Sequence, residues 1–305
     1  MPSLKAIRNR IASVKNTQKI TRAMKLVSAA RLKRAQDAMF AMRPYAKRIA
    51  DIVADVAAKN IPAEGEEPIH PFMERRHTKR ARLIVVTSDR GLAGGFNSNL
   101  IRHVERFVVE QKANFDSIEL SVVGRKGREH FKRRKVPLFK EYAGAAPGNA
   151  LELAREVGQE AASDFLGRKP SDPANQKPNP IVDDVFVVFN EFKSAIAQTI
   201  TIERLLPLDA ASAGKQANLV DFEYDPSKQE FLATLLPLYL ESRLLRVMLE
   251  SIASEFGARM AAMDSATKNA KEMISSLSLS FNRARQAAIT KELMEIVGGA
   301  EALKG

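Results

Sequence analysis

Residues 3–42 have the sequence SLKAIRNRIASVKNTQKITRAMKLVSAARLKRAQDAMFAM. Apolar residues recur in it at spacings of three and four, which places them in one stripe along an α-helix. The stripe begins at Leu4, Ile7, Ile11 and Val14, thins at Gln18 and Thr21, and resumes through Met24, Val27, Ala30, Ala35, Ala38 and Met42. No glycine interrupts residues 3–58, and Pro44 is the only proline there. We therefore predict one helix of about 80 Å, which is too long for a globular core and needs a partner helix.

The C-terminal part of the chain offers this partner. Asp225 and Pro226 form a helix start, because an N-cap residue is followed by proline at the first helical position. The helical pattern continues to about Val297, with a kink expected at Pro237. Small residues spaced by four would let two helix backbones approach closely; they are Ala253, Gly257, Ala261 and Ser265. We predict an antiparallel two-helix coiled coil, and the alternative is two independent helices packed on a globular domain.

Between the two helices, the hydrophobic pattern changes to that of a sheet. Four short segments are apolar or alternate apolar with polar residues, as strands do: residues 82–87, 118–123, 185–189 and 196–206. Helical patterns lie between them at residues 97–111, 127–134 and 149–167. This alternation predicts a small, mostly parallel α/β sheet. Residues 62–80 and 168–180 are rich in proline and polar residues, which predicts two loops.

The positive charge of the chain is concentrated near its N-terminus. Residues 1–48 hold thirteen Lys and Arg residues and one acid, Asp37, so this segment carries the whole net charge of +12. The rest of the chain has 35 basic and 35 acidic residues. Such asymmetry indicates an acidic partner for the first segment. Nucleic acid, an anionic membrane surface and an acidic protein collar all fit.

No stretch of the sequence predicts a catalytic, cofactor or metal site. The absence of cysteine excludes disulfides, thiolate metal sites and thiol catalysis. The four histidines lack the i, i+4 spacing of a zinc site, and no Ser-His-Asp or paired-carboxylate arrangement is recognisable. The glycine-rich residues 91–95 follow a strand, as a phosphate loop does, but their spacing differs from G-x-G-x-x-G. We interpret them as a tight turn, with Asn97 or Ser98 capping the next helix.

Residues 125–135 (RKGREHFKRRK) form a second basic cluster on a short helix. Contact with nucleic-acid phosphates is one interpretation, but the scarcity of interleaved aromatic residues favours a solvated helix face. No apolar run approaches the roughly 20 residues that a membrane helix needs. The helical pattern also starts directly after Met1, without a signal peptide. We therefore expect a soluble protein of the bacterial cytoplasm.

Four segments resemble one known family, the γ subunits of F-type ATP synthases. Residues 7–25 (IRNRIASVKNTQKITRAMK) are similar to the family's N-terminal helix, and residues 281–297 (FNRARQAAITKELMEIV) to its C-terminal helix. Residues 88–97 (SDRGLAGGFN) and 253–269 (ASEFGARMAAMDSATKN) resemble two further segments, and all four occur in the family's order. The loop at residues 168–180 is longer than the family leads us to expect. The cysteine-bearing insert of chloroplast γ subunits is absent, which excludes thiol switching.

The resemblance implies a long antiparallel coiled coil of the N- and C-terminal helices, with an inserted Rossmann-like α/β domain. The division that it implies is a coiled-coil helix at 1–60, a connecting loop at 61–80, the α/β domain at 81–207 with a flexible insertion at 168–180, a foot loop at 208–224 and a second coiled-coil helix at 225–305. The C-terminal helix would outlast its partner by roughly 20 Å. A single-helix tip with an apolar surface is therefore expected.

In function, the resemblance implies the central rotor shaft of an ATP synthase, inside a hexamer of α and β subunits and above a ring of c subunits. Such a shaft transmits rotation driven by hydrogen ion transport to the catalytic β subunits, and it regulates ATPase activity and proton flow without chemistry of its own. The implied partners are the α, β, ε and c-ring subunits. Membrane association would occur only through the complex, at the cytoplasmic face of the bacterial inner membrane. Contacts with the β subunits are implied for Met24, Lys25, Arg285, Gln286, Thr290 and Glu292.

Two other functions stay open at this point. A basic coiled-coil protein that binds nucleic acid would explain the charge of residues 1–48. A dinucleotide-dependent enzyme would explain the place of the glycine-rich turn after the first strand. The two differ in what they bind, because the first predicts steeply salt-dependent affinity for duplex DNA and the second predicts saturable binding of a cofactor.

Overall fold

The computed structural model describes residues 3–58, 70–74, 79–167, 182–208, 224 and 227–302. The chain divides into two compact units, one formed by residues 30–258 and the other by residues 1–29 together with 259–305. Two long helices, α1 (Leu4–Ala58) and α5 (Lys228–Ala302), contribute to both units. The expected pair of long terminal helices is confirmed, with a mixed α/β region between them in the sequence.

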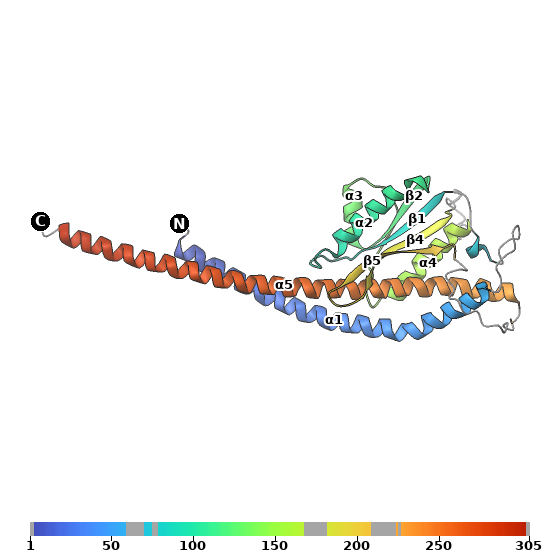
Figure 1. Ribbon diagram of the computed structural model, residues 1–305, viewed down its shortest axis with the longest axis horizontal. Coiled ribbons are helices and arrows are strands. Elements are labelled where there is room, and N and C mark those ends of the chain that lie inside the picture. Colours follow the sequence, from blue (N-terminus) through green and yellow to red (C-terminus); the bar gives the residue numbers. More distant parts are fainter. Residues whose placement is uncertain are drawn as a thin grey trace. The chain divides into compact units, whose positions relative to one another are not determined.

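A five-stranded sheet forms the centre of the unit at residues 30–258 (Figure 1). Its strands are β1 (Arg80–Val86), β2 (Ser117–Val123), β3 (Leu138–Tyr142), β4 (Asp184–Phe192) and β5 (Gln198–Leu206). Their spatial order is β3-β2-β1-β4-β5, with β5 antiparallel to β4 and every other pair parallel. The mostly parallel sheet follows from the alternation of strands with helices along the chain.

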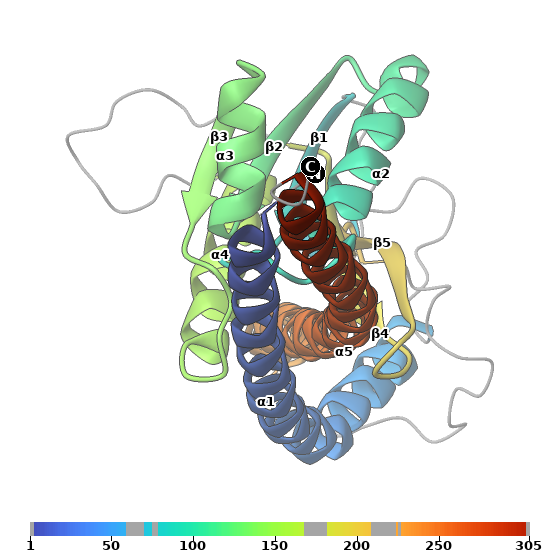
Figure 2. The ribbon, with the colours of Figure 1, turned by 90° about the vertical axis from the view of Figure 1, so that its left-hand side faces the viewer.

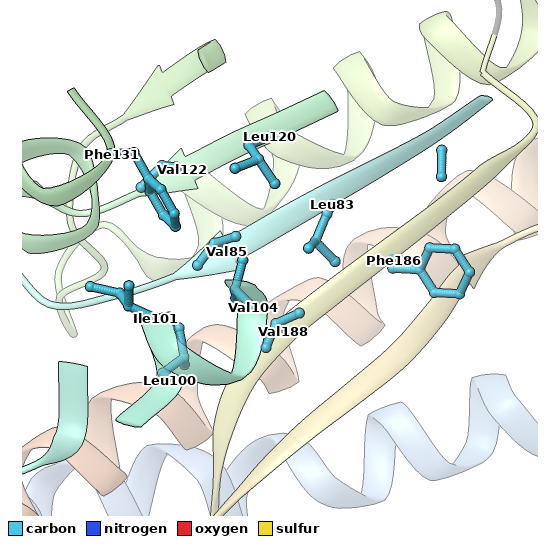
Figure 3. Packing of buried hydrophobic residues seen from close by; sticks show 11 residues of the cluster. Leu83, Val85, Leu100, Ile101, Val104, Leu120, Val122, Phe131, Phe186 and Val188 are labelled. Atoms are coloured by element: carbon cyan, nitrogen blue, oxygen red, sulfur yellow. The ribbon is translucent and has the colours of Figure 1, made fainter. Parts of the chain in front are cut away.

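Three shorter helices pack on the two faces of this sheet, and two 3-10 turns lie in the same described part of the unit. The helices are α2 (Phe96–Glu110), α3 (Arg125–Arg133) and α4 (Ala150–Leu166), and the turns are η1 (Pro71–Met73) and η2 (Gln111–Ala113). Side chains of α2 and α3 pack on one face, where Leu100 and Phe131 join strand residues such as Leu83 and Val188 in one buried cluster (Figure 3). Alternate strand residues face the same way, so this cluster uses every second position of β1.

The opposite face of the sheet holds a buried charge. Arg82, next to Leu83 in β1, has a side chain that is 2% exposed and forms ion pairs with Asp164 of α4 and with Glu119 of β2. Its guanidinium also lies 3.4 Å from the ring centroid of Phe139. A buried charge is costly unless it is paired and hydrogen-bonded, so this network fixes α4 against the sheet. Nothing in the spacing of these residues along the chain had indicated it.

Most sequence-predicted elements are confirmed to within a few residues, and one strand was missed. The predicted strands correspond to β1, β2, β4 and β5, and the predicted short helices to α2, α3 and α4. The missed strand is β3, which has only five residues, LFKEY, and forms one edge of the sheet. Its two charges and short length hide the strand pattern, because an edge strand has one side open to solvent.

The predicted helix caps were wrong where the structure describes them. Helix α2 begins after Gly95, and neither Asn97 nor Ser98 caps it. The amide of Asn97 instead exchanges hydrogen bonds with Ser88, at 3.0 Å to its backbone N–H and 2.8 Å to its hydroxyl, which ties the turn to the end of β1. Residues 225–226, the proposed start of α5, lie outside the described residues. The backbone N–H of Glu230 donates to the Ser227 hydroxyl at 3.3 Å, so Ser227 is the cap.

Gly257 was predicted to let the two long helices approach each other, but it lies against a different segment. A Cβ atom at this position would lie 2.9 Å from the backbone oxygen of Ala195, in the connection between β4 and β5. The glycine therefore allows α5 to approach that hairpin, rather than the other long helix. The loops predicted at 168–180 and 208–224 fall almost wholly outside the described residues, and the proposed domain boundaries stay a prediction.

Candidate partner-contact site on the helix pair

The second unit consists of the first part of α1 and the last part of α5, which lie side by side in both ribbon views (Figures 1 and 2). A hydrogen bond of 2.8 Å joins the hydroxyls of Thr21 and Thr267 across the two helices. Thr21 is where the apolar stripe of the sequence thins, and its side chain is buried. The polar break in the stripe therefore marks a point where two hydroxyls meet, and the pairing is antiparallel because Lys25 lies opposite the earlier residue Asp264.

A three-residue charge cluster lies one turn from the threonine pair. The ammonium of Lys25 donates to Oδ1 of Asp264 at 2.6 Å, and Lys268 reaches Oδ2 of the same carboxylate at 2.9 Å. These two hydrogen bonds lower the pKa of Asp264 to about 2, and the carboxylate raises the pKa of Lys268. Asp264 is about one third exposed, so water screens the attraction and the cluster aligns the helices more than it stabilises them.

Helix α5 continues well past the start of α1. The threonine and lysine contacts place Leu4, the first residue of α1, opposite the region near Arg285. Among the described residues of this unit, α5 therefore has no partner helix from there to Ala302 (Figure 1). Every side chain from Ile289 to residue 299 is exposed. Five of them are large and apolar, at 49–68% exposure: Ile289, Leu293, Met294, Ile296 and Val297. Exposed apolar groups gathered on one segment are typical of a binding surface.

The six residues predicted to contact partners fall into two separate groups. Met24 and Lys25 are half-buried on the paired stretch of α1. The other four are exposed on the unpaired end of α5, and they are Arg285, Gln286, Thr290 and Glu292. Within the second group, the Thr290 hydroxyl donates to the backbone oxygen of Gln286 at 3.0 Å. The structure does not bring the two groups together, and their contacts with other subunits stay a prediction.

The basic side chains of the first segment are mostly available to a partner. Lys15 and Lys19 line a groove of about 530 Å³ together with Lys271 of α5. Arg22 is exposed, and neither it nor the two lysines has an ion pair within the described residues. Lys25 differs from them, because Asp264 already neutralises it. This pairing could not be foreseen, since Lys25 reads in the sequence as one more cation of a uniform stripe.

Two other stretches singled out in the sequence have structural roles. The turn before α2 has positive φ at Leu92 (62°) and Gly94 (57°), which is a tight strand-to-helix turn as expected. In the basic cluster, Phe131 is buried, while Arg125 and Lys126 pair with Glu129, and Lys132 pairs with Glu141. Among the described residues, no three His, Asp or Glu side chains form a group that could hold a metal ion. No helix in that part of the chain is long and apolar enough to cross a membrane.

Comparison with known proteins places the chain in one family. The family model described as ATP synthase matches residues 3–303. ATP synthase gamma chains are 52% identical in Anaeromyxobacter sp. (strain K), 45% in Geobacter metallireducens and 42% in Sorangium cellulosum, each alignment covering 100% of both chains.

Solved structures agree in fold. A chain of the Euglena gracilis mitochondrial ATP synthase, in an assembly titled OSCP/F1/c-ring, aligns with a TM-score of 0.63 at 18% identity, over 98% of this chain and 94% of that one. A chain of the Tetrahymena thermophila central stalk and c-ring aligns with a TM-score of 0.55 at 24% identity, over 81% and 99%. With the identity shared along the full length of its bacterial relatives, this protein belongs to the ATP synthase gamma chain family.

Proposed function

We propose that this chain is the central rotor shaft of an F-type ATP synthase, which carries rotation of a c-ring to the catalytic β subunits and has no catalytic site of its own. The observation that supports it most directly is the unpaired end of α5, a single helix with five large apolar side chains exposed. A shaft that turns inside a ring needs a narrow end whose contacts are apolar and non-directional. Hydrophobic contact meets this need, because it does not depend on orientation.

The polar contacts of the shaft would be made by the six residues named from the resemblance. The four on α5 lie on its exposed end, and Met24 and Lys25 lie on the paired stretch of α1. Exposed ion pairs are worth only about 0–1 kcal/mol each. Contacts with successive β subunits can therefore form and break during rotation. Lys25 is expected to contribute through its position between the two helices, since the ion pair with Asp264 neutralises its charge.

The proposed partners are the α, β, ε and c-ring subunits, at the cytoplasmic face of the bacterial inner membrane. The unit around the sheet would provide the foot that grips the c-ring and the ε subunit, and the chain would reach the membrane only through them. The nucleic-acid alternative gains no support from the relatives, which are gamma chains of ATP synthases. The basic segment is better explained by an acidic region of the β subunits.

Disulfide crosslinking tests the rotor directly, because the chain has no cysteine of its own. Cysteines replacing Thr21 and Thr267 would join two parts of the same shaft. A cysteine replacing Glu292, paired with one in a β subunit, would join the shaft to its surroundings. In the reconstituted complex, we expect the first crosslink to leave ATP hydrolysis near the uncrosslinked rate and the second to stop it until a reductant is added. Equal inhibition by both would contradict rotation of this chain.

Charge reversal tests the basic segment. Changing Lys15, Lys19 and Arg22 together to Glu should leave the chain folded, because all three are exposed. It should alter ATP-driven proton pumping relative to the ATPase rate, with an effect that shrinks as salt rises. The matched control changes the same three residues to Gln, which removes their charge without reversing it and should have a smaller effect. An unchanged ratio of pumping to hydrolysis at low salt would show that the segment is only a solvated face.

A further inference from the structure

The unit at residues 30–258 contains a cavity of about 610 Å³ that the proposed rotor function does not use. It is bounded by α1, by the end of β5 and by α5, with Met73 of η1 at one side. A volume of 300–1,000 Å³ is the usual range for sites that bind small molecules. Size alone does not identify a ligand, so the chemistry of the walls decides what would fit.

One part of the cavity wall is apolar. Met39 and Val53 of α1 and Leu249 of α5 are buried side chains that line it. Ala46 and Ala50 of α1 also line the cavity, and their short side chains leave its volume free. An apolar body placed there would be removed from water at roughly 25 cal/mol per Å² of covered surface. The cavity therefore favours a ligand with a hydrophobic part.

Charged side chains line the rest of the cavity with an excess of cations. They are Arg43, Lys47, Arg204, Arg243 and Arg246 against Asp51, Glu203 and Glu250. Glu203 is shared, at 2.5 Å from Arg246 and 3.4 Å from Arg243. Neither Arg43 nor Lys47 forms an ion pair within the described residues, although the Arg43 guanidinium lies 4.9 Å from the ring centroid of Phe40. Two cations beside an apolar wall complement an anionic group.

A buried carboxylate completes the polar part of the wall. Glu250 accepts a hydrogen bond from Arg246 at 3.2 Å through Oε1, while its Oε2 is buried and has no hydrogen-bond partner within the described part of the chain. Burial raises the pKa of Glu250. An unsatisfied buried oxygen is costly, and protonation of Glu250 would lower this cost.

From these walls we propose that the cavity binds an apolar organic anion, a small molecule with one acidic group, such as a medium-chain carboxylate. The acidic group would lie against Arg43 and Lys47 at the rim, and the apolar body between Met39, Val53 and Leu249. This site depends only on contacts within residues 30–258. A failed test of this site would therefore leave the proposed rotor function unaffected, and the reverse is also true.

Two fluorescent probes of similar shape test the proposal on the purified full-length chain. The sulfonate 8-anilinonaphthalene-1-sulfonate carries the anion, and N-phenyl-1-naphthylamine has nearly the same apolar body without it. We expect the sulfonate to bind at one site and more tightly than the neutral probe, by about tenfold, the size of one charge-assisted hydrogen bond. Decanoate should displace the sulfonate, and 1-decanol should do so less well.

Variants then assign the binding to this cavity. Arg43→Gln with Lys47→Gln should weaken the sulfonate about tenfold and leave the neutral probe unchanged. The matched control is Arg34→Gln with Arg48→Gln, two exposed cations of α1 outside the cavity lining. Binding that is equal for both probes, or equally weakened by both pairs of substitutions, would overturn the proposal.

Filling the cavity gives a second, independent readout. Ala50→Phe should abolish the binding of both probes, and Ala46→Leu provides a smaller change in case the phenyl ring disturbs folding. The control is Ala41→Phe, at an exposed position of the same helix outside the lining. Circular dichroism and the urea midpoint establish that each variant is folded. Full binding of the sulfonate by a folded Ala46→Leu and Ala50→Phe would place the probe elsewhere and refute the site.

Discussion

The two units of this chain are built from the same two helices, yet they are held together by different interactions. Around the sheet, α5 buries a row of large apolar side chains, with Leu232, Leu236 and Leu244 all at 0% exposure. In the helix pair, the contacts described are a threonine pair, one charge cluster and a few buried side chains such as Met263. A single α-helix can therefore serve as a core element at one end and as an exposed surface at the other.

The difference indicates that the two units have different roles. Large buried side chains contribute roughly 1.5–3 kcal/mol each, which gives the unit around the sheet a stable base. The helix pair instead keeps its cations and apolar groups exposed, where they can meet other chains. A side chain that is exposed to partners is not buried in its own unit, so these groups contribute little to the stability of the helix pair. Four measurements would test this contrast.

The largest effect is expected from the buried ion pair under the sheet. Asp164→Leu leaves Arg82 buried beside a single remaining acid, Glu119, which is one third exposed. Loss of one partner of a buried pair costs about 3–5 kcal/mol, measured as the free energy of unfolding in urea. Adding Arg82→Met should recover most of this loss, because apolar replacements of a buried pair are often neutral. A single variant as stable as the wild type would show that the pair does not hold α4 in place.

Two glycines of α5 form a matched pair across the two units. A Cβ at Gly257 would lie 2.9 Å from the Ala195 backbone oxygen, whereas a Cβ at Gly298 meets nothing within 4 Å. We expect Gly257→Ala to destabilise the chain by about 1–3 kcal/mol through overpacking. Gly298→Ala should instead raise the helix content in far-ultraviolet circular dichroism, because alanine favours a helix over glycine by about 1 kcal/mol. Effects of the same sign at both positions would mean that the two stretches of α5 are packed alike.

A smaller effect is expected at the threonine pair. Thr21→Val and Thr267→Val each remove one hydroxyl of the 2.8 Å hydrogen bond and leave the other partly buried. Each should weaken the helix pair by about 0.5–1.5 kcal/mol, and the double variant should cost less than the sum. Hydrogen exchange of the α1 amides measures the stability of the helix pair, since the two helices can separate locally while the sheet stays folded. Strict additivity would show that the two hydroxyls do not interact.

The smallest effect concerns pH. The pKa of Asp264 is about 2 in the folded chain, because Lys25 and Lys268 donate hydrogen bonds to it. A lowered carboxylate pKa contributes stability above the ordinary value near 4, and this contribution is lost as the pH falls toward 2. The hydrogen-exchange difference between wild type and Asp264→Asn should therefore be constant from pH 7 to pH 5 and vanish near pH 2. A difference that persists there would point to packing rather than charge.

The sequence predicted the elements of this protein far better than its contacts. The long helices, four of the five strands and the excess length of α5 all follow from periodicity within a short window, where spacing by itself reveals a buried face. The strand β3 was not predicted, because an edge strand of five residues with two charges shows no clear alternation of apolar and polar residues. The start of α2 was mispredicted for a different reason, since the Asn97 side chain bonds to Ser88 of the preceding loop and does not cap its own helix.

The candidate site shows the same limit. The exposed end of α5 was predictable, because it depends on the lengths of two helices and on their antiparallel pairing. The neutralisation of Lys25 by Asp264 was not, because the two residues are 239 positions apart and meet only through the register of the helix pair. Arg82 with Asp164, 82 positions apart, and the cavity beside Arg43 and Lys47 are likewise products of packing. Local periodicity determined which segments form helices and strands, and only the tertiary structure decided which side chains meet, because meeting requires a register that no short stretch of sequence carries.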